Sequence, residues 1–284
     1  MTIETVSENK AHGGVQGVYR HASSATGTPM TFSVFLPPQA EDRNAGAALP
    51  VICYLSGLTC THANVTEKGE YRAACAEHGI VFIAPDTSPR GDGVPDSADY
   101  DMGQGAGFYL DATQEPWADH FRMRSYIEQE LPELVNGNFP IDPDRQAIMG
   151  HSMGGHGALT IALRNQGRFR SVSTFAPICA PSEVPWGQKA FSAYLGDDRD
   201  QWRKHDAVAL IEDGATLPDL LVDQGTDDQF LSDGQLRPDL LQQACETAGI
   251  PAKVRMQEGY DHSYYTISTF MPDHVGWHAE RLKA

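Results

Sequence analysis

Residues 150–155 read Gly150-His151-Ser152-Met153-Gly154-Gly155 and set a single serine among small residues. The apolar run Ala147-Ile148-Met149 comes just before them, after turn residues, and predicts a buried strand. A helix-compatible segment follows at residues 158–163 and stops at Asn165-Gln166-Gly167. A strand that turns this sharply into a helix presents one side chain at its tip, and the small neighbours let the two elements approach closely.

A Gly-x-Ser-x-Gly pattern at a strand-to-helix junction resembles the nucleophile elbow of α/β-hydrolases, whose serine attacks an acyl carbon. The alternative is a glycine-rich turn with an incidental serine. The strand and the helix predicted on either side favour the elbow, so Ser152 is the candidate nucleophile.

The composition is that of an ordinary globular protein, with 40% hydrophobic and 21% charged residues among 284. We expect residues 1–284 to form a single domain, because this length allows one large core. The net charge of −17 argues against nucleic acid and anionic membrane surfaces as partners. Apolar runs such as Val51–Leu55 are far too short to cross a membrane.

Cysteine usage indicates the redox compartment. The five cysteines are odd in number and show no Cys-x-x-Cys spacing, and the polar stretch Met1–Gly14 lacks the apolar segment of a signal peptide. We therefore expect a reduced, cytoplasmic protein. The cysteines are Cys53, Cys60, Cys75, Cys179 and Cys245.

Short apolar runs alternate with helix-compatible segments, which predicts parallel crossovers and an α/β fold: a doubly wound, mostly parallel sheet flanked by helices. Two stretches, 86–107 and 177–213, are too irregular for simple connectors and are expected to cover the site. The expected strands lie at 32–36, 51–55, 80–84, 147–149, 171–176, 220–223 and 254–256. The expected helices lie at about 67–78, 121–135, 158–163 and 238–248, and from about 263 onward.

An acid and a base should follow the serine in that order, in loops at the carboxyl ends of later strands. Asp227 and Asp228 both come after the strand at 220–223, and the pattern alone leaves the choice between them open. His262 follows the last predicted strand and fits the base.

Two other histidines, His274 and His278, also follow the acid and share one face of the terminal helix, four residues apart. Such a pair suggests either a metal site or a solvated helix face. No third ligand or acidic partner motif accompanies the pair, which favours the solvated face, and no metal is expected.

The developing oxyanion needs two backbone donors. One is the N–H of Met153, the residue after the nucleophile, and the other should come from the loop Ser56–Thr61 after an earlier strand.

Several stretches together resemble the S-formylglutathione hydrolases, also called esterase D, and the match runs through nearly the whole chain from about Tyr19. One matching stretch is the loop Leu55-Ser56-Gly57-Leu58-Thr59-Cys60-Thr61, and another is the elbow, Gly150 to Gly157. The other matching stretches, in order, lie at 84–91, 105–109, 223–230 and 259–265.

The resemblance implies Ser152 as nucleophile, His262 as base and Asp228 as acid, with the N–H groups of Leu58 and Met153 as oxyanion donors. It also implies that S-formylglutathione is hydrolysed to formate and glutathione, in the cytoplasm, by a homodimer without an organic cofactor.

Three further hypotheses concern the surroundings of the site. Trp186 and Phe230 either close a tight acyl pocket or pack as ordinary core residues. Cys60, two residues from Leu58, is either a thiol whose modification blocks the site or a buried inert one. Because glutathione carries two carboxylates, a basic contact is expected, and the candidates, each also readable as a plain surface charge, are Lys68, Arg90 and Lys189.

Rival functions share these residues. A broad-specificity small-acyl carboxylesterase would use the same triad, and an acyltransferase would pass the acyl group to an alcohol. A catalytically inactive relative used for binding is the third alternative, against which the intact triad argues.

Overall fold

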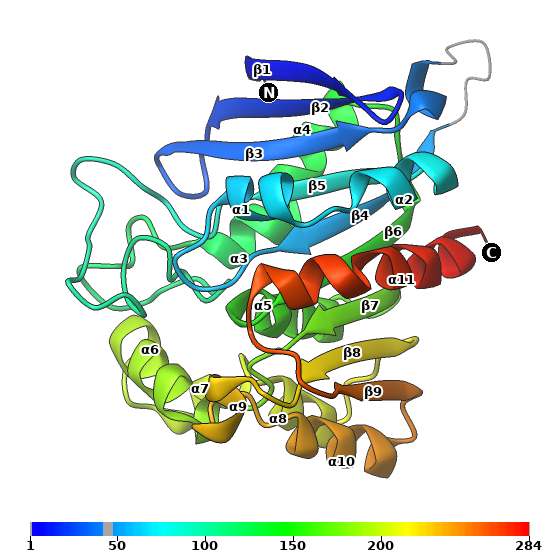
Figure 1. Ribbon diagram of the computed structural model, residues 1–284. Helices are drawn as coiled ribbons and strands as arrows, with labels where there is room; N and C mark the ends of the chain where they lie inside the picture. Colours follow the sequence, from blue (N-terminus) through cyan, green and yellow to red (C-terminus); the bar gives the residue numbers. More distant parts are fainter. Residues whose placement is uncertain (1, 42–47, 284) are drawn as a thin grey trace.

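The computed structural model describes residues 2–41 and 48–283 (Figure 1). Within them, nine strands form one sheet in the order β1-β2-β3-β5-β4-β6-β7-β8-β9. The strands are β1 Glu4–Ala11, β2 Gly14–Ala22, β3 Pro29–Leu36, β4 Leu49–Leu55, β5 Val81–Pro85, β6 Ile141–His151, β7 Phe169–Phe175, β8 Leu220–Gly225 and β9 Ala252–Gln257.

The sheet is parallel from β5 to β9 and antiparallel at its other edge, where β1, β2 and β3 follow one another and β3 joins β5. The predicted α/β fold with a mostly parallel sheet is therefore confirmed. The predicted strands all occur, and several extend a few residues beyond their expected ends.

Helices cover both faces of the sheet. In Figure 1, α1, α2 and α11 lie on the near face, while α4 and α5 lie behind it. The α-helices are α1 His62–Lys68, α2 Arg72–His78, α3 Met123–Ser125, α4 Leu131–Asn138, α5 Met153–Arg164, α6 Pro185–Leu195, α7 Arg199–Arg203, α8 Ala207–Glu212, α9 Gln229–Ser232, α10 Pro238–Ala248 and α11 Tyr264–Lys283. Short turns of 3₁₀ or π geometry occur at η1 Pro38–Glu41, η2 Tyr126–Glu130 and η3 Pro181–Glu183.

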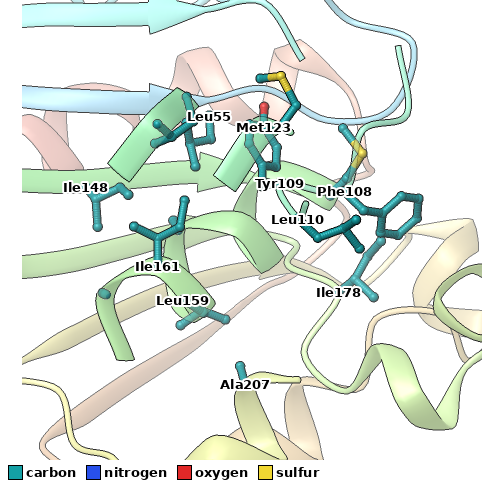
Figure 2. Close-up of a cluster of buried hydrophobic side chains, with 14 of the residues drawn as sticks. Leu55, Phe108, Tyr109, Leu110, Met123, Ile148, Leu159, Ile161, Ile178 and Ala207 are labelled. Carbon is teal, nitrogen blue, oxygen red and sulfur yellow. The ribbon is translucent and has the colours of Figure 1, made fainter. Parts of the chain in front are cut away.

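The central strands are apolar on both faces because each face is buried under helices. Successive side chains of β6 alternate, so that Ile148 joins the core on the α5 face and Met149 joins the core under α11. Figure 2 shows Ile148 and Leu55 from the sheet in the same cluster as Leu159 and Ile161 from α5. This core fixes α5 against the sheet. Within the described residues, none of the helices combines the length and the apolar character that a membrane span requires.

The sequence did not indicate strands β1 and β2. The side chains of Glu4–Ala11 are exposed along nearly the whole strand, so the apolar alternation on which strand prediction depends is absent. The signal that could have indicated the two strands was the turn between them, at His12-Gly13. His12 and Gly13 both have positive φ (49° and 80°), the conformation of a two-residue hairpin, and Ala11 pairs with Gly14.

The helix expected at 67–78 is two helices. The chain turns at Gly69 and Glu70, where Glu70 has a positive φ of 53°. Gly69 still follows the helix, with its N–H donating to the carbonyl of Val65 at 2.8 Å, so the left-handed conformation of Glu70 is what ends α1.

The helix expected at 121–135 begins at Met123 and contains the π turn η2. Pro132 has no N–H to donate to the carbonyl of Glu128, and that carbonyl instead accepts a hydrogen bond from Arg168 at 2.7 Å. The wider turn therefore follows from the proline.

The stretch 86–107 contains no helix or strand, and 177–213 holds only η3, α6, α7 and α8, as expected. Both stretches gather at the end of the sheet where the parallel strands terminate, seen on the left of Figure 1 near α6. Ligands of open parallel sheets bind at this end.

Candidate active site

Ser152 lies at the junction of β6 and α5 with φ 56° and ψ −119°, a conformation rarely adopted by a residue with a side chain. Its N–H donates to the carbonyl of Phe175 at 2.9 Å, and its carbonyl accepts from His156 at 3.0 Å and Ile178 at 3.2 Å. These three backbone bonds hold the strained turn in place.

The glycines around Ser152 permit the close approach that the sequence suggested. A side chain at Gly154 would lie 1.9 Å from the carbonyl oxygen of Leu55, and one at Gly150 would lie 2.0 Å from the carbonyl oxygen of Gly154. Helix α5 therefore starts directly against the end of β4.

Asp228 and His262 come together across 34 residues of sequence. Oδ2 of Asp228 lies 2.6 Å from Nδ1 of His262, and the same carboxylate accepts hydrogen bonds from the N–H of Phe230 at 2.8 Å and from Gln224 at 3.0 Å. Burial opposes ionisation of Asp228, but these hydrogen bonds, that from His262 foremost, outweigh it and lower the pKa of the carboxyl. The carboxylate is thus ionised, buried and directed at the imidazole.

The neighbouring aspartates occupy different positions. Asp227 is exposed, and its N–H donates to the carbonyl of Tyr260. Asp223 lies within β8, as expected, and is fully buried, where its carboxylate pairs with Arg255 and His274. Of the two candidates that the pattern left open, Asp228 is the one in contact with the histidine.

His262 contacts the elbow at His151. The imidazole ring of His262 lies 4.5 Å, between centroids, from that of His151, which directly precedes Ser152. The side chain of His262 is 16% exposed, so it borders solvent on one side. The structure thereby brings the serine, histidine and aspartate of the predicted triad to one end of the sheet.

The loop after β4 lies against the elbow. A side chain at Gly57 would stand 3.1 Å from Cβ of Ser152 and 3.1 Å from Nδ1 of His151, so the backbone there runs beside the candidate nucleophile. Leu58 follows in a turn that is half-buried, while Met153 opens α5 and is fully buried. Both candidate donors therefore sit on backbone segments adjacent to Ser152.

Residues that the sequence did not single out as anchors fix this loop. Thr59 donates its N–H to the carbonyl of Gly105 at 2.9 Å, and the carbonyl of Cys60 accepts from Arg90 at 2.9 Å and from the Thr87 hydroxyl at 2.5 Å. Arg90 also pairs with Asp86 at 3.0 Å. This arginine, a candidate glutathione contact, is thus engaged within the loop.

The other basic candidates differ from each other. Lys189 pairs with Asp99 at 2.9 Å and Asp101 at 2.6 Å, whereas Lys68 is an exposed residue in the last turn of α1.

Trp186 and Phe230 form an aromatic wall beside the histidine. The ring of Phe230 meets His262 edge-on at 4.8 Å, and the ring of Trp186 lies 4.6 Å from Phe230. Tyr100, which no sequence pattern pointed to, accepts a hydrogen bond from Nε1 of Trp186 at 3.1 Å.

Cys60 is buried, and burial raises the pKa of its thiol above the usual range. All five cysteines are free. A protonated, buried thiol reacts slowly, which favours the inert alternative for Cys60 in the resting protein.

His274 and His278 share one face of α11, but the solvated face expected for them is wrong, because both are fully buried. Nε2 of His274 lies 3.0 Å from Asp223, and Nδ1 lies 2.9 Å from the Ser173 hydroxyl, which is also 2.7 Å from Nε2 of His278. Nδ1 of His278 lies 2.7 Å from the hydroxyl of Ser171, beyond which the chain of contacts ends. In the part of the chain that the structure describes, there is no cluster of three or more side chains suited to holding a metal.

The hydrogen bonds that link Asp223, His274 and Ser173 can be assigned one consistent set of donors and acceptors. Asp223 is also bonded by Arg255 at 2.5 Å; burial opposes its ionisation, but the bonds from His274 and Arg255 outweigh it and lower its pKa to about 2. His274 must then donate through Nε2, and Nδ1 accepts from Ser173. Burial lowers the pKa of both histidines, which matches a neutral pair held by hydrogen bonds.

A strained serine at a strand-to-helix turn, with an Asp–His pair beside it on a mostly parallel sheet, defines the class of α/β-hydrolase-fold serine hydrolases. The family model described as "Putative esterase" matches residues 23–281. The chain is 56% identical over 282 residues to the S-formylglutathione hydrolase of Paracoccus denitrificans, covering 99% of both chains, and 52% identical over 287 residues to that of Mus musculus, covering all of both.

The chain belongs to this esterase family and, within it, to the S-formylglutathione hydrolases. A solved structure of an S-formylglutathione hydrolase from Agrobacterium tumefaciens superposes with a TM-score of 0.95 at 55% identity, covering 98% of this chain and 99% of that one.

Proposed function

We propose that the protein is a serine hydrolase that cleaves the thioester S-formylglutathione into formate and glutathione. The observation that carries the proposal is the 2.6 Å contact between Asp228 and His262 beside the elbow of Ser152. Full-length relatives more than 50% identical carry the name of this activity and support the substrate.

Acylation begins at Ser152. Because Nδ1 of His262 donates to Asp228, Nε2 is the nitrogen free to take the serine proton as Oγ attacks the formyl carbon. The N–H groups of Leu58 and Met153 stabilise the oxyanion, and each such donor contributes about 2.7–4 kcal/mol in comparable sites. The carbon–sulfur bond then breaks, and glutathione departs readily as a thiolate, since its thiol has a pKa near 8.5. The thiolate takes the proton from the His262 imidazolium, which restores the neutral base for the next step.

Deacylation repeats the same steps with water. His262 takes a proton from water as its oxygen attacks the formyl-serine, and returns a proton to Oγ of Ser152 when the ester bond breaks. Formate leaves and the serine hydroxyl is restored. Asp228 remains ionised throughout and stabilises the imidazolium that forms transiently.

The aromatic wall suits a small acyl group. Phe230 stands beside His262, and Trp186 packs against Phe230, so we propose that the two rings limit the space next to the reacting carbon. An apolar pocket discriminates single methylene groups by only about 1–3 kcal/mol, so short acyl esters should react more slowly rather than not at all.

Steady-state kinetics with S-formylglutathione tests the proposal. We expect kcat/KM for this thioester to exceed that for p-nitrophenyl acetate, and the Ser152→Ala variant to lose about 10⁴–10⁶-fold in kcat. A ratio near or below one would instead support a broad small-acyl carboxylesterase, the alternative favoured by the esterase description of the matching family model. Failure of a fluorophosphonate probe to label Ser152 would refute both.

The proposal also covers the domain organisation, the oligomeric state, the compartment and the cofactor requirement. We propose one domain over residues 1–284, with the stretches 86–107 and 177–213 as its covering, acting as a homodimer in the reducing cytoplasm without metal or organic cofactor. The five free cysteines and the net charge of −17 support a reduced compartment and a small-molecule substrate rather than nucleic acid or a membrane surface.

A further inference from the structure

Tyr100 combines exposure with a specific bond to a buried group. Its side chain is 57% exposed, yet its hydroxyl accepts the hydrogen bond from Nε1 of Trp186, which is only 6% exposed. The two rings meet edge-on, with centroids 6.4 Å apart and planes at 84°. The indole N–H of Trp186 thus depends on a surface residue for its partner.

The backbone on both sides of Tyr100 is attached to the helix that carries Trp186. Lys189 lies one turn after Trp186 on α6, and its ammonium group pairs with Asp99 at 2.9 Å and with Asp101 at 2.6 Å. Residues 99–101 are therefore joined to α6 by two ion pairs and one hydrogen bond, which together fix where the phenol stands.

The same loop continues to the turn that contains Leu58 and Thr59. Two turns further along α6, the hydroxyl of Tyr194 accepts from the N–H of Gly103 at 2.9 Å and donates to the carbonyl of Ala106 at 2.8 Å. The carbonyl of Gly105 accepts from the N–H of Thr59 at 2.9 Å, next to Leu58. Loop 99–106 thereby links α6 to the backbone that holds a candidate oxyanion donor.

On the side away from Tyr100, the ring of Trp186 is connected to the candidate base, His262, through Phe230. Its ring packs against Phe230 at 4.6 Å, and Phe230 meets the imidazole of His262 at 4.8 Å. The backbone N–H of Trp186 donates to Gln235 at 3.0 Å, which fixes the start of α6, while the indole is held by its packing in the core and by its one hydrogen bond, from Nε1 to Tyr100.

We propose that Tyr100 is a positioning residue that sets acyl selectivity by holding the indole of Trp186 against Phe230. Without the hydroxyl, a buried N–H loses its partner, and the indole gains by turning toward water. The space beside His262 then admits larger acyl groups. The inference rests on the hydrolase site of the proposed function but not on S-formylglutathione as its substrate.

The test compares p-nitrophenyl acetate with p-nitrophenyl butyrate, which share a leaving group and differ only in the acyl chain. In Tyr100→Phe we expect the ratio of kcat/KM, butyrate over acetate, to rise about fivefold, the scale set by one neutral hydrogen bond. The matched control is Tyr265→Phe, whose side chain is 84% exposed, and its ratio should equal that of the wild type.

A double-mutant cycle separates positioning from a general structural effect. Trp186→Phe removes the donor, so Tyr100→Phe added to it should change the ratio less than twofold. If Trp186→Phe does not fold, Lys189→Met serves in its place: releasing the flanking aspartates should move the ratio in the same direction as Tyr100→Phe.

The outcomes are distinguishable from those of the proposed function. An active wild type whose ratio is unchanged by Tyr100→Phe overturns this inference alone, as does an undiminished effect in the Trp186→Phe background. A wild type that hydrolyses neither ester overturns the hydrolase site and this inference together.

Discussion

The carboxylate of Asp228 lies 2.6 Å from Nδ1 of His262 and is fully buried, whereas the adjacent Asp227 is exposed. We expect Asp228→Asn to lower kcat by about 10⁴-fold with little change in fold, because the amide no longer holds the required tautomer or stabilises the imidazolium. Asp227→Asn is the matched control and should retain wild-type kcat. Equal losses in the two variants, measured with one substrate and checked by circular dichroism, would contradict the assignment.

Gly57→Ala should weaken catalysis more than stability. The added methyl group would stand 3.1 Å from Cβ of Ser152, a contact tight enough to displace the loop that carries Leu58 by a few tenths of an ångström. Removing a donor entirely costs about 10²–10³-fold in kcat, so a displaced donor should cost up to that amount.

The readout for Gly57→Ala is kcat at saturating substrate together with the midpoint of thermal unfolding. Unchanged kcat in the folded variant would show that this loop does not supply an oxyanion donor. Gly137→Ala is a suitable control, since a side chain there meets open space.

Acid should destabilise the protein from about pH 6.5 downward. Burial lowers the pKa of His156 from 6.5 to about 4, so between these values the unfolded chain binds a proton that the folded chain does not. The contribution of His156 to the free energy of unfolding is therefore fully present above pH 6.5. It is lost as the pH falls toward 4, at about 1.4 kcal/mol per pH unit.

The variant His156→Gln isolates that contribution while keeping a donor for the carbonyl of Phe108, which His156 contacts at 3.0 Å. Its free energy of unfolding, from urea titrations between pH 7 and 5, should fall less steeply with acid than that of the wild type. Identical slopes would mean that His156 is not held neutral in the fold.

Cys60 should react slowly in the resting protein, but once alkylated it should abolish activity, because the thiol lies two residues from Leu58 in a packed loop. Burial raises the pKa of this thiol above 9.0, so the rate of inactivation by iodoacetamide should still be rising at pH 9 instead of levelling off. Cys60→Ser should resist inactivation. Full activity after stoichiometric alkylation of Cys60, verified by mass spectrometry, would overturn this expectation.

The parallel half of the sheet could be predicted because its strands are buried on both faces and appear as continuous apolar runs, as at Val51–Leu55. Strand β1 could not, since its side chains meet water on both faces and carry no periodic signal. The break after Gly69 comes from the left-handed conformation of Glu70, a backbone state that the apolar pattern does not show.

The elbow and the order of acid and base could be predicted from local patterns, which left Asp227 and Asp228 open. The family resemblance indicated Asp228, and the physical reason, its burial against His262, appears only in the structure. His274 and His278 looked like surface residues because their partners Ser173 and Asp223 lie on distant strands. Tyr100 belongs to no motif, and its contact with Trp186 arises only when loop and helix meet.

The polar chain from Asp223 through His274 and Ser173 to His278 ties the final helix to the middle of the sheet. Before α11 docks, β7 and β8 would expose two serine hydroxyls and leave the Asp223 carboxylate without its imidazole partner. Helix α11 is therefore part of what makes the central strands stable, because without it these polar groups of β7 and β8 would lose their imidazole partners.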